Sequence, residues 1–460
     1  MHFIIVRFAG FFKVKDFPLA AEKTFYLETF GCQMNVVDSE RIIDSLKQIG
    51  YRQVAVVEDA GLILLNTCSV RDKAERKVYG HLGSFKPLKA DNPALIIGVG
   101  GCVAQQEGER LLEKLPFLDL VFGTHNVHKL PEMVQEVERN RVRCIETDFL
   151  DRETRLALFP RRTEGDAVSR FVTVMQGCDN FCSYCVVPHV RGREISRPSA
   201  EILAEIEELS AGGVREVTLI GQNVNSYGAR IEGELSFAAL LAAVQAIDGI
   251  ERIRFTTSHP RDLSGELIAA FGTLDKLCLH IHLPVQCGSD RVLKMMNRGY
   301  TRAEYLDRVR RLKEVAPQIR LTSDIIVGFP GESEEDFAAT LALVAEVRYA
   351  DVFTFLYSSR PGTAAAALVD DLPAAVRQER FDRLLALQDS ISREIWAADV
   401  GAVLPVLVEG ESRQGEGQIF GRTTWNRIVN FPGSPELIGR TVPVRILRSN
   451  KNTQLGEQVI

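Results

Sequence analysis

The feature that most constrains the fold of this chain is a repeated alternation of apolar segments with helical ones. Between residues 24 and 145, three apolar segments are each followed by a stretch with helical spacing: TFYLETFG, AGLILLNT and PALIIGVGG precede NVVDSERIIDSLKQIGY, VRDKAERKVYGHLGSF and AQQEGERLLEKLP. Strands that are apolar on both faces, joined by helical crossovers, are typical of a parallel sheet covered on both sides. The sequence therefore predicts an open parallel α/β sheet in this region.

A longer series of the same kind follows over residues 169–395. Six segments have the pattern of strands, RFVTVMQG, EVTLIGQN, RIRFTTS, CLHIHLPV, RLTSDIIVGF and DVFTFLY, and helices are predicted at 199–212, 236–247, 263–271, 301–315 and 333–347. Units of roughly 30 residues fit a complete or partial parallel (β/α) barrel. From residue 398 the pattern changes to short β segments with Gly and Pro turns, which predicts a small all-β barrel.

These changes of pattern predict an α/β chain in five parts. They are an N-terminal extension (1–22), an open-sheet domain (23–145), a charged linker (146–168), the barrel domain (169–395) and the small β-barrel (398–460). Within the linker, Arg161 and Arg162 are expected to be solvated or to face RNA.

Composition and charge narrow the location and the partners. Hydrophobic residues make up 45% of the chain and charged residues 25%, and the apolar runs are too short to cross a bilayer, so no membrane is expected. The nine cysteines are an odd number without a secretory signal, which indicates a reducing, cytoplasmic compartment. Because the net charge is −6, an RNA site must be a local patch.

Three cysteines stand close together in VMQGCDNFCSYCVVPHVRGRE: Cys178, Cys182 and Cys185. Thiolates select soft metals, chiefly zinc, copper(I) and iron–sulfur clusters. Three thiolates on one irregular loop suit a 4Fe–4S cube whose fourth iron stays open to a small molecule. The alternatives are a zinc site with a distant fourth ligand, or three cysteines at helical spacing on a buried face.

A second set of cysteines is spread along the open-sheet domain. Cys32, Cys68 and Cys102 each follow a predicted strand, and the carboxyl ends of parallel strands share one edge of a sheet. The sequence therefore predicts three converging thiolates, which suit a second 4Fe–4S cluster with an open iron. Neighbouring Gly31 and Gly101 fit a backbone that approaches a cluster closely. The alternative for each cysteine is a small buried apolar residue.

The loop cysteines, with Tyr184 before the last of them at the mouth of a βα barrel, resemble the radical S-adenosylmethionine superfamily. Three segments resemble the N-terminal domain of its methylthiotransferases: ETFGCQMNVVDSE, NTCSVRDKAERKV and GCVAQQEGE. Two resemble their radical domain: HIHLPVQCGSDRVLKMMNRGYTR and TSDIIVGFPGESEEDF. One resembles their TRAM domain: GRTTWNRIVNFPG. FTTSHP and CSYCVVPHVRGREISRP are most similar to the members that modify isopentenylated adenosine in tRNA. The alternatives are a methylthiotransferase acting on a ribosomal-protein aspartate or on threonylcarbamoyl-adenosine in tRNA, and a non-catalytic iron–sulfur RNA-binding sensor.

The resemblance implies a reaction and its cofactors. Two 4Fe–4S clusters and S-adenosyl-L-methionine would add a methylthio group to carbon 2 of N6-isopentenyl-adenosine beside the anticodon. Cys178, Cys182 and Cys185 would serve radical generation, and the other trio would serve sulfur delivery. One S-adenosylmethionine supplies the methyl group and a second supplies the 5′-deoxyadenosyl radical. The implied partners are a tRNA anticodon stem-loop and an electron donor of flavodoxin or ferredoxin type, and the chain is expected to be a monomer.

Further residues are candidates for the S-adenosylmethionine site or for RNA. Tyr184 is expected near the adenine, Gln222 and Asn223 near the amino group, and Ser258 and Asp324 at the ends of barrel strands on the catalytic face; core packing or turn capping is the alternative. Arg191 and Arg193 are expected to meet phosphate or the carboxylate of the cosubstrate, or to be a solvated pair. The small barrel is expected to present a basic surface with aromatic residues: Arg422, Trp425, Arg427, Phe431, Arg445, Arg448 and Lys451. The alternative is an ordinary solvated barrel face with Trp425 in its core. Three other cysteines are expected to be structural: Cys144, Cys278 and Cys287.

Overall fold

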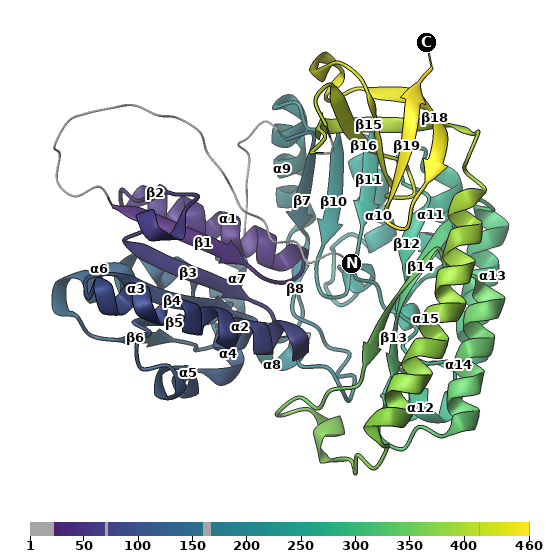
Figure 1. Cartoon of the computed structure of the whole chain (residues 1–460). Coiled ribbons are helices and arrows are strands. Elements are labelled where there is room, and N and C mark those ends of the chain that lie inside the picture. The colour runs from purple at the N-terminus through teal and green to yellow at the C-terminus, as the bar shows by residue number, and fades with distance from the viewer. Residues whose placement is uncertain (1–22, 70–71, 160–166, 414, 460) are drawn as a thin grey trace. The chain divides into compact units, whose positions relative to one another are not determined.

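The structure of the chain is a computed structural model that describes residues 23–69, 72–159, 167–413 and 415–459. The described residues form two compact units (Figure 1). The first holds the chain up to residue 159 together with Gln176–Asp179 and Cys185–Ile195, and the second holds the remainder. The N-terminal extension and the pair Arg161 and Arg162 lie outside the described residues. No helix in the described ranges has the length and apolar character needed to span a bilayer.

The first unit is built on a six-stranded sheet in the order β2-β1-β3-β4-β5-β6, and all its pairings are parallel. This confirms the predicted open parallel sheet. The strands are β1 (Thr24–Thr29), β2 (Arg52–Gln53), β3 (Leu62–Thr67), β4 (Ile96–Gly101), β5 (Leu120–Phe122) and β6 (Cys144–Glu146). The helices are α1 (Gln33–Gln48), α2 (Asp72–Ser84), α3 (Lys86–Asp91), α4 (Cys102–Glu107), α5 (Glu109–Lys114), α6 (Leu130–Asn140), α7 (Arg152–Ala157) and α8 (Val187–Arg191).

The central strands of this sheet are buried on both faces, as their apolar sequences require. Alternate residues of β3 enter two separate hydrophobic clusters: Leu62 and Leu64 pack with α1 and α6, while Ile63 and Leu65 pack with residues of α2 and α5. The prediction of a single helix over AQQEGERLLEKLP is wrong, because the structure has two helices there. Gly108, at φ +54°, separates α4 from α5.

The second unit contains a parallel barrel that is left partly open. β7 (Ser169–Thr173), β10 (Glu216–Ile220) and β11 (Arg252–Phe255) form one sheet, and β12 (His280–His282), β13 (Arg320–Val327) and β14 (Asp351–Leu356) form another. An isolated parallel bridge between Ile253 and Leu277 links β11 to the segment just before β12. Helices α9 (Ser199–Ala211), α10 (Phe237–Gln245), α11 (Gly265–Thr273), α12 (Asp290–Met295), α13 (Arg302–Val315), α14 (Glu334–Val347) and α15 (Ala374–Ala397) accompany the strands (Figure 1).

The C-terminal part of the second unit is a closed five-stranded barrel in the order β15-β16-β17-β19-β18, as expected. Its strands are β15 (Val403–Glu411), β16 (Gln418–Arg422), β17 (Ile428–Pro432), β18 (Thr441–Ser449) and β19 (Thr453–Gln458). Two buried arginines and one partly buried arginine attach it to the parallel strands. Arg252 and Arg254 of β11 donate to backbone carbonyls of the small barrel, and Arg320 at the start of β13 pairs with Asp399.

Two short strands, β8 (Met175–Gln176) and β9 (Ile195–Ser196), flank the cysteine loop. The segment after Cys185, including α8, belongs to the first unit. Thr124 donates to the carbonyl of Val190 at 2.6 Å, and His125 lies 3.1 Å from the carbonyl of Arg191. The expected linker, residues 146–168, contains the helix α7. The division of the chain into five parts stays a prediction.

Candidate active site

The three spread cysteines of the first unit lie at the carboxyl ends of adjacent parallel strands. Cys32 is the N-cap of α1 after β1, Cys68 directly follows β3, and Cys102 begins α4 directly after β4. The Cys68 thiol is hydrogen-bonded to both Cys32 and Cys102. The structure thus brings these three side chains together.

Contacts within this trio shift the pKa values of its three thiols in different directions. Hydrogen bonding to Cys102 and Cys32, with burial, raises the pKa of Cys68 well above its usual range. A hydrogen bond from Cys68 lowers the pKa of Cys32 to about 6, and the positive charge of Arg191 acts in the same direction against burial. The separate interaction between Cys68 and Cys102 lowers the pKa of Cys102 to about 7, and Arg191 acts in the same direction. At neutral pH, Cys32 is therefore mostly thiolate, Cys102 is partly so and Cys68 keeps its proton. Thiolates are the metal-binding form of cysteine.

Arg191 supplies the positive charge beside this trio. It ends α8, its side chain is 6% exposed, and it forms an ion pair of 2.7 Å with Asp38 of α1, which is 3% exposed. It also hydrogen-bonds Cys102. The expectation of a phosphate contact or a solvated arginine is wrong for Arg191, because the helix carries its side chain into the interior. Arg193 is 70% exposed and pairs with Asp179 at 2.9 Å.

Two glycines and an asparagine network allow the strand ends to meet. A Cβ on Gly31, at φ +142°, would lie 2.6 Å from Cβ of Cys68, and one on Gly101, at φ +90°, would collide with the carbonyl of Thr67. Asn35 accepts from the Cys32 amide at 3.4 Å and donates to the Thr67 carbonyl at 3.0 Å. The cradle around the thiols is thus built from close backbone approach.

The other three cysteines lie in an irregular loop, so the alternative of a helical face is wrong. Cys178 and Cys185 belong to the first unit and Cys182 to the second. The amide of Cys178 donates to the carbonyl of Gly192 at 3.2 Å. Cys102 packs against Val186 and Val190, which follow Cys185 in the chain. The first unit therefore holds one complete thiol trio beside the segment that leaves the cysteine loop.

No group of three or more His, Cys, Asp or Glu side chains in the described ranges has the arrangement of a single-ion site. The role of the six cysteines as ligands therefore stays a prediction. The three cysteines expected to be structural have no thiol partners. Cys278 and Cys287 are buried, Cys144 is partly buried, and burial raises the pKa of each.

The candidates for S-adenosylmethionine binding lie in different settings within the second unit. Tyr184 packs against the barrel core, and Gln222 and Asn223 follow β10. Asn223 donates to Asp262 at 2.7 Å. Ser258 lies beyond the end of β11 and is buried. The expected position of Asp324 at a strand end is wrong, because it lies inside β13 with a carboxylate oxygen 3.6 Å from the ring of His282.

Sequence reasoning missed Arg298, which donates to Cys182 and to Tyr184 at 3.2 and 3.3 Å. The only sequence signal was its place in the motif MMNRGYTR, which also resembles the radical domain. The contact arises across the loop and cannot be read from spacing.

The aromatic part of the expected surface of the small barrel is wrong, whereas most of its basic part is confirmed. Phe431 is fully buried in the barrel core, and Arg427 is buried and lies over the ring of Trp396. Trp425 packs on the same core and carries Arg320 over its ring at 3.8 Å. Four basic residues of the expected set remain exposed or half-buried: Arg422, Arg445, Arg448 and Lys451.

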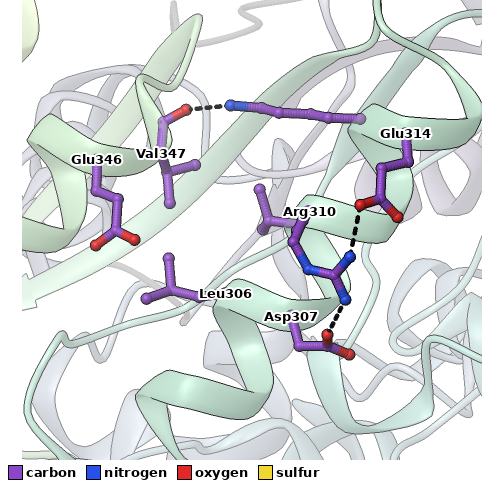
Figure 2. A pocket seen from close by; sticks show the side chains of 8 residues that line it. Leu306, Asp307, Arg310, Glu314, Glu346 and Val347 are labelled. Carbon is purple, nitrogen blue, oxygen red and sulfur yellow. Dashed lines mark hydrogen bonds and ion pairs between the residues drawn. The ribbon is translucent and has the colours of Figure 1, made fainter.

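A hollow of about 600 Å³ lies elsewhere in the second unit, between α13 and α14 (Figure 2). Its charged groups satisfy one another, since Arg310 lies between Asp307 and Glu314 and Lys313 donates to the Val347 carbonyl. None of the cysteines or other candidate residues lines it. We therefore place the candidate site at the thiols and not at this hollow.

A partial (β/α) barrel whose first strand leads into a Cys-x3-Cys-x2-Cys loop defines the class of radical S-adenosylmethionine proteins. Family models agree: the Radical SAM superfamily matches residues 172–344, Uncharacterized protein family UPF0004 matches 24–123, and the TRAM domain matches 397–459. A radical S-adenosylmethionine methyltransferase, TsrM, from Kitasatospora setae has a similar fold, with a TM-score of 0.56 and 14% identity over 86% of this chain and 79% of that one.

Curated relatives identify the particular family. The tRNA-2-methylthio-N(6)-dimethylallyladenosine synthases of Syntrophotalea carbinolica and Geobacter metallireducens are 62% and 59% identical to this chain. The matches cover 95% and 96% of this chain and 100% of each relative. The chain belongs to the tRNA-2-methylthio-N(6)-dimethylallyladenosine synthase family, which confirms the resemblance drawn from its motifs.

Proposed function

We propose that this chain adds a methylthio group to carbon 2 of N6-isopentenyl-adenosine beside the anticodon of tRNA. The observation that carries the proposal is the high identity to synthases of that name along nearly the whole chain. The gathering of Cys32, Cys68 and Cys102 at one sheet edge supports it, because the reaction needs a second site that holds sulfur.

The residues of the first unit suit a 4Fe–4S cluster. Three thiol donors from three strand ends leave a fourth corner without a protein ligand, and thiolates are the ligands such clusters use. Arg191 offsets part of their negative charge, and Gly31 and Gly101 allow the backbone to approach closely at this edge. Cys32, Cys68 and Cys102 would hold the cluster that delivers sulfur.

Cys178, Cys182 and Cys185 would hold a second 4Fe–4S cluster, which would supply the electron for the reductive cleavage of S-adenosylmethionine. Tyr184, Gln222, Asn223 and Ser258 would orient S-adenosylmethionine in the second unit, with Asp324 further inside the barrel. The buried side chains of this region exclude water around the reacting groups.

The proposal extends to partners and location. The substrate is the anticodon stem-loop, whose splayed bases are the usual targets of sequence-specific RNA proteins. An electron donor of flavodoxin or ferredoxin type supplies the electrons, and the chain acts as a monomer in the cytoplasm. The exposed arginines of β18, Arg445 and Arg448, are the best placed to meet RNA phosphates.

The decisive experiment is mass spectrometry of tRNA nucleosides from a deletion strain. We expect the methylthio-isopentenyl nucleoside to disappear and its unmodified precursor to accumulate, with recovery on complementation. Persistence of that nucleoside would reject the proposal. Loss of a methylthio group from ribosomal protein, or from threonylcarbamoyl-adenosine, would assign the chain to a related substrate instead.

Iron analysis tests the two cysteine sets separately. Two four-iron clusters give about eight irons per chain. Replacing all three cysteines of either set by alanine should remove about half of the iron and sulfide from anaerobically reconstituted protein. A triple variant with unchanged iron content would show that its cysteines hold no cluster.

A further inference from the structure

Arg298 is a buried guanidinium that uses its donors on one small region of the second unit. Its residue is 4% exposed. Nη1 donates to the sulfur of Cys182 at 3.2 Å and to the Tyr184 hydroxyl at 3.3 Å, and Nη2 donates to the carbonyl of Pro284 at 2.7 Å. Nε donates to the hydroxyl of Tyr300 at 3.0 Å. One side chain therefore connects a loop cysteine to the residues that follow β12.

The surroundings of Arg298 hold this contact in place before anything binds. Ser183 makes two hydrogen bonds to the segment that carries Arg298. Its amide donates to the Met296 carbonyl at 3.0 Å, and its hydroxyl donates to the Met295 carbonyl at 2.8 Å. Asn297 donates to the Phe181 carbonyl at 3.0 Å. The segment that carries Cys182 is thus fastened to the segment that carries Arg298.

The charge of Arg298 has no carboxylate partner among the ion pairs of the described residues, unlike several other buried arginines. Arg197 pairs with Glu205, and Arg254 pairs with Glu216 at 3.0 Å. A buried charge is costly unless it is paired. Of the groups that accept from Arg298, only the sulfur of Cys182 becomes an anion when it ligates a metal.

We infer that Arg298 is a positioning residue for the cluster held by Cys182: it donates an N–H···S hydrogen bond to the ligand sulfur and serves as the counter-ion of the thiolate. This inference rests on the proposed function, in which Cys182 is a ligand. Hydrogen bonds to the sulfurs, net charge and burial set the reduction potential of iron–sulfur clusters. Because reduction by an external low-potential donor adds one electron and no proton, a fixed positive charge stabilises the reduced form and raises the potential.

The test isolates one cluster and measures its potential. In the full chain carrying Cys32→Ala, Cys68→Ala and Cys102→Ala, we compare Arg298→Met and Arg298→Lys with the parent by iron content and by a redox titration followed by electron paramagnetic resonance. For Arg298→Met we expect retained iron and an at least tenfold smaller reduced-to-oxidised ratio at a fixed potential, a downward shift of about 59 mV for a one-electron couple. Arg298→Lys keeps the charge without the planar fork and should shift less in the same direction.

Arg291→Met is the matched control. Arg291 is 52% exposed and donates to Asp336, Gly331 and Met295, not to a cysteine of the loop, so its loss should leave the potential unchanged. An unchanged potential in Arg298→Met with full iron would overturn the inference. If Arg298→Met does not fold, Arg298→Lys takes its place: a downward shift of the potential supports the inference, and an unchanged potential with full iron overturns it. Absence of iron from the parent itself would instead reject the proposed function.

Discussion

At the scale of single residues, the most consequential pair is Asp38 with Arg191. Both side chains are nearly inaccessible, and they lie 2.7 Å apart next to the thiols of the first unit. Breaking a buried ion pair by removing one partner leaves the other charge unpaired, which costs about 3–5 kcal/mol. The pair therefore couples the folding of α1 to the placement of α8.

Asp38→Ala should lower the free energy of unfolding by about 3–5 kcal/mol in denaturant titrations. The double variant Asp38→Ala with Arg191→Met should recover part of the loss, since neither charge is then left alone. Additive effects of the two single changes would contradict a direct interaction.

Cys32 should be the reactive thiol of the metal-free protein. Because its pKa is lowered to about 6 while burial raises that of Cys144, Cys32 is mostly thiolate at pH 6.5 and Cys144 is not. After allowing for the lower nucleophilicity of a less basic thiolate, iodoacetamide should label Cys32 about five times faster. Peptide mass spectrometry measures both rates in one sample. Arg191→Met should slow Cys32 toward the rate of Cys144, and equal rates in the parent protein would refute the assignment.

At the scale of elements, the strand-to-helix junctions carry the site, and they explain what could be predicted. The order of apolar strands and helical stretches was enough to place Cys32, Cys68 and Cys102 at one sheet edge, because the topology of a parallel sheet determines which ends meet. The break at Gly108 and the position of Asp324 depended on local backbone geometry. The burial of Arg191 depended on a segment of the cysteine loop packing on the open-sheet unit, which no local pattern indicates.

Gly101→Ala tests one of these junctions. The residue has φ +90° and its new Cβ would collide with the Thr67 carbonyl, so we expect a loss of about 1–3 kcal/mol in stability and less iron bound by the first-unit trio. Gly80→Ala, in helix α2 with open space around it, is the control and should stabilise the protein by about 0.5–1 kcal/mol. Equal effects of the two changes on thermal unfolding would argue against a special role for this junction.

At the scale of the whole molecule, the small barrel is an integral part of the second unit. Arg254, fully paired with Glu216, also donates to the carbonyls of Thr423 and Thr424 at 2.6 and 2.8 Å. These contacts explain why the prediction of an aromatic surface on the small barrel was wrong. Its conspicuous arginines and aromatics, such as Arg427 and Trp425, serve attachment and packing, which composition cannot distinguish from RNA binding.

Arg254→Met should loosen this attachment. It leaves Glu216 buried without its partner, at a cost of about 3–5 kcal/mol, and limited proteolysis near residue 400 should accelerate. Arg445→Met removes an exposed pair with Glu457 and should change stability by less than about 1 kcal/mol. Intact resistance to protease in Arg254→Met would show that other contacts hold the small barrel.

The attachment point has a geometric consequence. The arginines that fasten the small barrel include the first residue of β13, whereas Cys182 is held through Arg298 by Pro284, beyond the carboxyl end of β12. β12 pairs with the first three residues of β13, and Leu283 donates to the Thr322 carbonyl, so Pro284 lies about level with Asp324. At about 3.3 Å per residue, it is roughly 13 Å from Arg320 along the strand direction. We therefore expect a tRNA that contacts both the small barrel and the cysteine loop to span this distance along the second unit.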